Sequence, residues 1–201
     1  YYSKWVYTDN RVWWEFGGAM SNILVQNIKH TNNTTAMTVD SSGFVDFPQS
    51  SMIQQWVLTA NVTSDTTLTN FSEVSTTFYA SMGASMSHSS GVFTFPTTGL
   101  YKVHSTFMMQ NASGSQDNSM GIRTQGSNDS GGSFEDIIRV FDGGTNSMFS
   151  GVSGMALINV TNASTFRVRF FADSLSSGSV ILGTTAYTGS NVVFERIGNS
   201  Q

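Results

Sequence analysis

Three histidines, a scattering of carboxylates and many hydroxyl groups are the side chains of this sequence that could carry acid–base, nucleophilic or metal chemistry. The histidines are His30, His88 and His104, and no two of them stand at the spacing of a metal-binding pair. The sequence contains no Cys, which excludes thiolate nucleophiles, thiolate metal sites and disulfides. A Ser–His–Asp triad would have to be assembled from distant segments, and no motif predicts one. We therefore predict no cofactor and no metal requirement for folding.

Paired carboxylates could instead hydrolyse a glycan, because one of them protonates the leaving group while the other acts as base or nucleophile. Glu135 and Asp136 are adjacent in the sequence, and adjacent residues of a strand face opposite sides of a sheet. The other acidic residues fall mostly in expected turns, where Asp commonly caps the backbone. The sequence therefore predicts that this protein is not an enzyme.

The composition describes a surface that is poor in charge. Charged residues make up 11% of the 201 residues, and the formal net charge is -4; an ordinary domain has about 25% charged residues. The nine Lys and Arg residues are scattered, whereas nucleic-acid binding depends on clustered phosphate contacts. No apolar run approaches the roughly 20 residues of a membrane span. We predict neither a nucleic-acid nor a membrane partner, and a surface of hydroxyls and amides that fits an all-β extracellular or virion protein.

The elements that would position these side chains are strands. Period-two alternation recurs along the chain between clusters of Gly, Ser, Asn and Asp, and helical periodicity is nearly absent. The pattern divides the chain into an aromatic hairpin (1–20), a collar of short strands (21–48) and a sandwich head (49–201). The strands of the collar are too short to form a core alone, so we expect identical chains to cover one another's apolar faces.

The first sixteen residues contain seven aromatic side chains around a predicted Asp9–Asn10 turn. An isolated hairpin is marginal in water, so this segment is expected to pack on another part of an assembly. The alternative is a platform on which sugar rings stack. Both interpretations assign a partner contact to the same side chains, namely Trp5, Tyr7, Trp13 and Trp14. Because the chain begins without Met and shows no signal-peptide pattern, we expect a processed chain or a piece of a longer one.

The head contains about ten predicted strands, which indicates a sandwich or jelly roll. The predicted strands are 52–63, 76–81, 91–96, 99–110, 118–126, 134–142, 148–159, 165–173, 178–187 and 191–197. His104 alternates with Val103 in one of these strands, so we predict a half-buried or interface histidine. Two polar stretches, 111–118 and 126–133, flank one strand and are candidate receptor loops. Their candidate contact residues are Asn111, Gln116, Asp117, Asn128 and Asp129.

One corner of the head carries a recognisable motif. Pro cannot donate to a strand ladder, so the segment GVFTFPTTGLY (91–101) predicts two strands joined at the proline. Its spacing resembles the "G-x-F-x-x-P-x-x-G-x-Y" signature of the C1q/TNF-like jelly roll. The matching residues are Gly91, Phe93, Phe95, Pro96, Gly99 and Tyr101. The segments 150–171 and 188–198 resemble the paired strands and the closing strand of that family, so the resemblance covers roughly 49–198.

The resemblance implies a setting as well as a fold. The connector AMTVDSSGFVDFP (36–48) followed by the C1q-like head is similar to proteins of tailed, especially marine, bacteriophages. Such modules generally form trimers at the ends of fibres or appendages, or decorate capsids. Animal members of the family can bind calcium near the trimer apex, but no acidic residue of this chain aligns with those ligands, so calcium stays open.

We therefore expect a non-enzymatic, homotrimeric structural protein on the surface of a virion. Its C1q-like head would contact the host surface, through a glycan or a protein, and its N-terminal part would contact other virion proteins. One alternative is a capsid decoration or cement protein whose aromatic N-terminus grips the shell. The other alternative is a secreted lectin-like module without a virus.

Overall fold

The computed structural model divides the chain into two compact units, Tyr1–Gln49 and Ser50–Gln201. It describes residues 2–3, 6–8, 11–13, 16–17, 27–29, 35–39, 41–43, 45–46, 52–74, 79–114 and 116–201. All secondary structure of this described part is β-structure, which confirms the all-β prediction. None of its elements is a helix of the length and apolarity needed to cross a membrane.

The first unit consists of short antiparallel strands. They are β1 (Tyr2–Ser3), β2 (Val6–Thr8), β3 (Arg11–Trp13), β4 (Phe16–Gly17), β5 (Asn27–Lys29), β6 (Thr35–Val39) and β7 (Val45–Asp46). Thr8 pairs with Arg11 and Val6 with Trp13, which is the register of the hairpin expected around positions 9 and 10. Strands β5, β6 and β7 form a separate three-stranded sheet. The division at residue 20 and the mutual covering of collar strands stay predictions.

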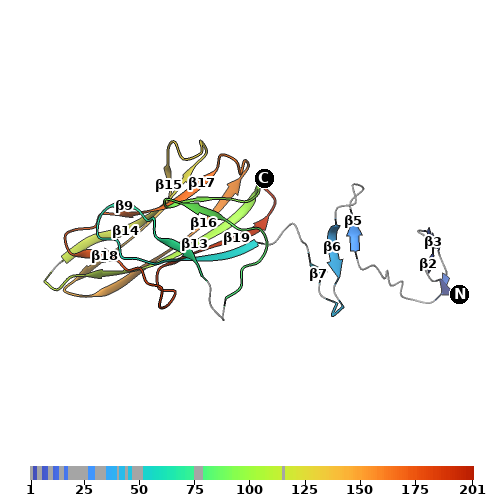
Figure 1. The fold of residues 1–201 in the computed structure, drawn as a ribbon, viewed down its shortest axis with the longest axis horizontal. Coiled ribbons are helices and arrows are strands. Elements are labelled where there is room, and N and C mark those ends of the chain that lie inside the picture. Colours follow the sequence, from blue (N-terminus) through green and yellow to red (C-terminus); the bar gives the residue numbers. More distant parts are fainter. Residues whose placement is uncertain are drawn as a thin grey trace. The chain divides into compact units, whose positions relative to one another are not determined.

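The second unit, which we call the head, is a sandwich of two antiparallel sheets (Figure 1). The β13 sheet has the order β10-β8-β19-β13-β16, with β18 also paired to β13. The β14 sheet has the order β11-β12-β17-β14-β15, with β9 paired to β17. The strands are β8 (Met52–Leu58), β9 (Thr66–Thr67), β10 (Phe71–Glu73), β11 (Ser87–Ser89), β12 (Val92–Thr94), β13 (Gly99–Asn111), β14 (Gln116–Ser127), β15 (Glu135–Thr145), β16 (Phe149–Val160), β17 (Arg167–Asp173), β18 (Ser179–Ile181) and β19 (Asn191–Gly198).

Aromatic side chains from both sheets meet between the layers and form the core of the head. Phe93 is fully buried and lies at the centre, with its ring centroid 5.3 Å from Phe71, 5.9 Å from Phe170 and 5.0 Å from Phe194. These rings come from β12, β10, β17 and β19, so one side chain joins strands of both sheets. Ring pairs at such distances add to the hydrophobic gain of burial. The period-two pattern of the sequence thus becomes an inward aromatic layer.

Two turns explain the spacing of the motif: the turn between β11 and β12, which holds Gly91, and the corner between β12 and β13. Gly91 has a φ of +85°, and a Cβ there would lie 2.5 Å from Cγ2 of Thr67 and 2.6 Å from the carbonyl oxygen of Leu68. Only glycine meets both the dihedral angle and the close approach. Beyond the proline, the fully buried Tyr101 packs on Phe95 at 4.6 Å, and its hydroxyl donates to the carbonyl of Thr97 at 2.9 Å. Gly91 therefore turns the chain between two strands of the β14 sheet, and the residues around Pro96 carry it from there into the β13 sheet.

His88 lies in β11 and contacts the aromatic core. Its ring is 4.6 Å from Phe93 and 5.7 Å from Trp56, and its Nε2 accepts the N–H of Gly91 at 3.1 Å. Burial lowers the pKa of His88 below its ordinary value of 6.5. The folded state therefore favours the neutral ring, whose Nε2 lone pair is needed by Gly91.

We expect the stability of the head to decrease as the pH falls below the ordinary histidine pKa. The unfolded chain protonates His88 near pH 6.5, whereas the fold resists that proton, so the contribution of His88 is complete above 6.5 and is lost on the way to the lower, folded pKa. Melting curves between about pH 7.5 and about pH 5 measure this step. The variant His88→Gln, which keeps an acceptor but does not titrate, should lack it. An identical pH dependence in wild type and variant would contradict the assignment.

Candidate functional site on the β15–β16 edge

The described part of the chain holds no cluster of three or more His, Cys, Asp or Glu side chains that could bind a metal ion. Asp136, one of the two adjacent carboxylates considered above for glycan hydrolysis, has a structural role. Asp136 binds Arg139, accepts the side-chain amide of Gln125 at 2.7 Å and lies 3.7 Å from Arg123. Burial alone would raise the pKa of Asp136, but the hydrogen bonds from Gln125 and Arg139 outweigh it and lower the pKa. A strongly bound carboxylate of this kind is a poor proton donor.

The clearest functional feature of the head is an apolar outward surface on β16. Along this strand Val152, Ala156 and Ile158 point into the sandwich and are buried. The alternate positions face outward, and Met155 and Leu157 are 54% and 59% exposed. A strand with large apolar side chains on both faces can bury only one face in the sandwich. The other face stays in water, which is typical of an interaction surface.

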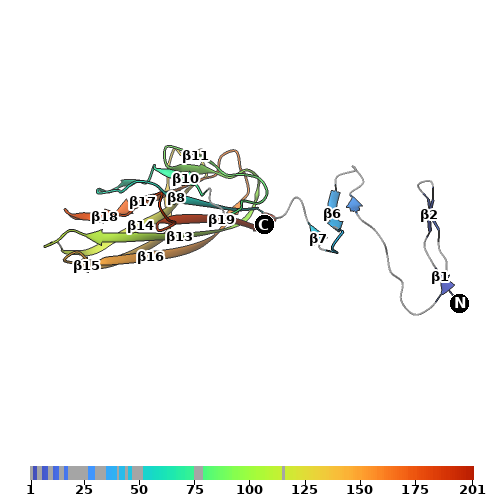
Figure 2. The same cartoon turned by 60° about the horizontal axis from the view of Figure 1, so that its bottom comes forward.

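The strands β13 and β19 follow β16 in the same sheet (Figure 2). Their outward positions beside Met155 and Leu157 include polar side chains. His104 stands directly opposite Met155 and Lys102 opposite Leu157. Nε2 of His104 lies 2.8 Å from the hydroxyl of Ser153. Lys102 forms an ion pair with Glu195 on β19. His104 is exposed in the single chain, and not half-buried as one version of the prediction had it. It lies beside the apolar residues of β16, and its place in an interface stays a prediction.

Strand β15 extends the apolar surface around the edge of the sandwich. β15 and β16 are the outermost strands of their two sheets. A tight turn joins them, in which Asn146 and Ser147 have φ values of +48° and +66° and the N–H of Met148 donates to Thr145 at 3.1 Å. Nine large hydrophobic side chains are exposed in the described part of the head, and six of them belong to this hairpin. The six are Ile137, Phe141, Met148, Phe149, Met155 and Leu157.

A glycine in the adjacent strand allows one of these side chains to lie flat on the β14 sheet. A Cβ at Gly121 would overlap the Cδ1 atom of Phe141. The ring of Phe141 therefore occupies the space that a side chain at position 121 would fill, and 43% of Phe141 stays exposed. We call the six residues together the β15–β16 edge.

Two of the predicted receptor-loop residues are buried. Asn111 and Asp117 are 1% and 4% exposed. Asp117 accepts the N–H of Ser176 at 2.9 Å and the hydroxyl of Ser179 at 2.6 Å, and Asn111 donates to the same hydroxyl at 3.3 Å. Their polar groups join the ends of β13 and β14 to the segment before β18, so a receptor could not reach them directly. Short polar side chains predict a loop in the sequence, but they do not show whether each side chain points toward solvent or toward the protein interior.

We expect Asp117→Ala to lower the free energy of unfolding by about 1–3 kcal/mol, because buried donors lose their acceptor. Burial would raise the pKa of Asp117, but the hydrogen bonds from Ser176, Ser179 and Ser119 outweigh it and lower the pKa below 3.8. Its contribution is therefore present above pH 3.8 and is lost as the pH falls through the folded pKa. Urea unfolding at neutral pH measures the loss, and Gln116→Ala, at the exposed neighbouring position, is the control. Equal stability of both variants would show that the buried carboxylate contributes nothing.

The other predicted loop residues, Gln116, Asn128 and Asp129, are exposed. Asp129 organises its own loop, because its carboxylate accepts the hydroxyl of Ser127 at 2.6 Å and the backbone N–H of Ser133 at 3.0 Å. These hydrogen bonds lower the pKa of Asp129 far below its usual range. The loop is thus held in one shape, and a partner contact by its exposed residues stays a prediction.

The predicted aromatic contact near the N-terminus lies largely outside the described residues. Trp5 and Trp14 belong to that undescribed part. Tyr7 and Trp13 lie in β2 and β3, of which the structure describes the backbone pairing only. Their role as a partner contact stays a prediction.

Known proteins share the fold of the head but not its sequence. No protein-family model matches the chain, and no curated protein matches it. Among solved structures, Eiger TNF from S. frugiperda matches with a TM-score of 0.59 at 9% identity, over 76% of this chain and 96% of that one. Murine APRIL at pH 5.0 matches with a TM-score of 0.56 at 10% identity, over 73% and 98%. At such identities the likeness shows the fold alone, and it confirms the predicted TNF-like jelly roll.

Proposed function

We propose that the head assembles into a homotrimer through the β15–β16 edge and serves as a structural, non-enzymatic binding module. The observation that carries this proposal is the concentration of exposed apolar side chains on one hairpin, which holds six of the nine that the described part of the head exposes. Burying apolar surface gains about 25 cal/mol per Å², and closed homo-oligomers are the usual way to cover such a surface. Trimers are typical of the C1q/TNF-like fold, which supports three copies over two.

Within this proposal the chain is a fibre or appendage protein on the surface of a bacteriophage particle. The support is the resemblance of the connector 36–48 and of the corner 91–101 to phage proteins, together with the low charge content. The head would contact the host surface, and the first unit would contact other virion proteins. Asp136, His88 and His104, which could have served catalysis, take part in packing and hydrogen bonds, which favours a binding role over an enzymatic one.

Light scattering and sedimentation equilibrium of the full chain test the assembly. The expected mass is three times the 21.8 kDa of one chain, maintained on dilution to nanomolar concentration. A stable monomer that does not aggregate would contradict assembly through this edge. A stable dimer would contradict the assembly of three copies.

The position on a particle needs a separate test, because a trimer could serve several settings. Binding of the assembled full chain to intact bacterial cells is the result expected of an attachment protein. Retention by purified capsid protein that depends on residues 1–20, without cell binding, would support capsid decoration instead.

A further inference from the structure

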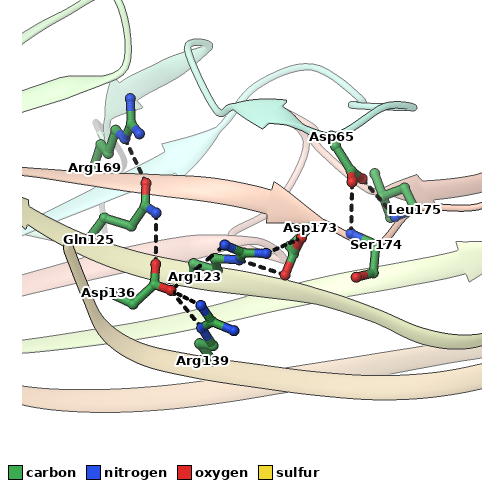
Figure 3. A network of polar contacts seen from close by, with 9 residues as sticks. All are labelled: Asp65, Arg123, Gln125, Asp136, Arg139, Arg169, Asp173, Ser174 and Leu175. Carbon is green, nitrogen blue, oxygen red and sulfur yellow. Dashed lines mark hydrogen bonds and ion pairs between the residues drawn. The ribbon is translucent and has the colours of Figure 1, made fainter. Parts of the chain in front are cut away.

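The outward face of the β14 sheet gathers charged side chains that lie far apart in the sequence (Figure 3). The head has six Lys and Arg residues, and four of them lie on β14, β15 and β17. They are Arg123, Arg139, Arg167 and Arg169. In a protein with 11% charged residues this is an unusual concentration.

Three of the four arginines are occupied by other groups of the head. Arg123 forms a two-pronged ion pair with Asp173, with contacts of 2.6 and 2.7 Å. Arg139 binds the carboxylate of Asp136. Arg167 donates to the backbone carbonyls of its own turn, at 2.7 Å to Phe166 and 2.9 Å to Ser164. Their positions are therefore explained by the stability of the sheet.

Arg169 differs because its charge is held in place but not neutralised. Its Nε donates to the side-chain oxygen of Gln125 at 2.7 Å, and the amide nitrogen of Gln125 donates in turn to Asp136 at 2.7 Å. Asp136 thereby fixes which end of the Gln125 amide faces the arginine. The guanidinium carbon lies 4.0 Å above the ring of Phe134 and 5.7 Å from that of Phe171. Hydrogen bonding and cation–π stacking together fix the plane of the guanidinium group.

The terminal nitrogens of Arg169 make no hydrogen bond and no ion pair with any described residue, and a single dashed line reaches this side chain in Figure 3. Arg carries five N–H donors, so four stay available at the outer end of the group. Partial burial removes the charge of Arg169 partly from water and lowers its pKa, and the nearby charge of Asp136 opposes this effect only in part. A planar, oriented and partly desolvated guanidinium is suited to a two-pronged bond with a carboxylate.

We propose that Arg169 is the centre of a binding site for the carboxylate of an acidic sugar. One unneutralised charge matches a single carboxylate, whereas a polyanion would need a row of free cations. The side chains around it suit a sugar ring: the guanidinium covers one face of Phe134, Phe171 adds an apolar ring beside the group, and Thr67, half-buried, stands opposite Phe171 in the sheet. The site lies on β17, whereas the proposed trimer contact uses β15 and β16. The proposal rests on the proposed function only in that a host glycan would supply the sugar.

Ligand-observed saturation-transfer NMR of the full chain tests the site with two sugars that differ at one carbon. Glucuronate carries a carboxylate where glucose carries a hydroxymethyl group. We expect saturation transfer to glucuronate and at least tenfold weaker binding of glucose. Equal signals from the two sugars would overturn the proposal. The third probe is N-acetylglutamate α-amide, which carries the carboxylate of a glutamate side chain without a sugar ring. If it binds as strongly as glucuronate, the ligand is a protein carboxylate and the sugar assignment is wrong.

Three variants locate the binding at Arg169. Arg169→Gln removes the charge and should reduce glucuronate binding at least tenfold. Gln125→Glu leaves Arg169 in place but sets a carboxylate beside its Nε, so it should weaken binding even if Arg169→Gln fails to fold. Arg139→Gln removes an equal charge from an arginine already paired with Asp136 and should leave binding within about twofold. Unchanged binding in both Arg169→Gln and Gln125→Glu would place the ligand elsewhere. Trimer mass and cell binding are measured independently, so failure of this site is distinguishable from failure of the proposed function.

Discussion

Replacing Phe93 by alanine is expected to lower the free energy of unfolding of the head by about 3–5 kcal/mol. Phe93 is fully buried and touches aromatic rings from strands of both sheets, so its removal leaves a cavity that no single neighbour can fill. The cost combines the transfer free energy of the missing ring with the dispersion attraction that the surrounding rings no longer gain across the cavity.

Chemical unfolding in urea, followed by tryptophan fluorescence, measures this loss. The control is Tyr187→Ala, which removes an aromatic ring from the surface outside the β15–β16 edge, where Tyr187 is 59% exposed. We expect the control to change the stability of one folded chain by less than about 0.5 kcal/mol. Similar losses in the two variants would mean that Phe93 is not the centre of the core.

Introducing arginine at Met155 is expected to raise the concentration at which the assembly dissociates by a hundredfold or more. Met155 lies in the middle of the apolar outward face of β16, opposite His104. An interface that covers this residue would bury an unpaired charge in every copy, at a cost of several kcal/mol. About 1.4 kcal/mol changes an equilibrium constant tenfold.

Sedimentation equilibrium over a dilution series measures the change, and Met82→Arg is the matched control. Met82 has nearly the same exposed fraction as Met155, 52% against 54%, but pairs with Ile53 on β8, away from the β15–β16 edge. The control should keep the wild-type mass. Dissociation by Met82→Arg, with Met155→Arg unaffected, would place the interface on another part of the β13 sheet.

The long strands of the head could be predicted because their alternation is strong. The predicted strands 99–110 and 148–159 agree with β13 and β16 to within one residue at each end. The corner at Pro96 was predictable because proline cannot donate a hydrogen bond to a strand ladder and glycine allows backbone conformations that other residues avoid. The short strands β9, β10 and β11 were missed, since two or three residues carry no period. The predicted strand 76–81 is wrong in its described part, where 79–81 lie outside any named strand.

The sites were harder to predict than the strands, because they depend on which distant segments meet. The four arginines of the β14 sheet are scattered in the sequence and become neighbours only through the register of β14, β15 and β17. Asn111 and Asp117 have the sequence surroundings of loop residues, although the sheet ends turn them inward. The β15–β16 edge did leave a signal: in MFSGVSGMALIN (148–159) apolar residues occupy both alternating sets, so one set had to face outward.

The place of β19 in the β13 sheet has a consequence for how the protein is made. This strand is the last one of the head in sequence order, yet it lies between β8 and β13 in the interior of its sheet. The sheet therefore cannot close until residue 198 has left the ribosome, and until then β8 and β13 lack the strand that joins them. Nascent chains of this protein should depend on chaperones that shield strand edges throughout translation. The head should therefore fold in one late step once β19 is available, in keeping with the slow closure of sheets built from distant segments.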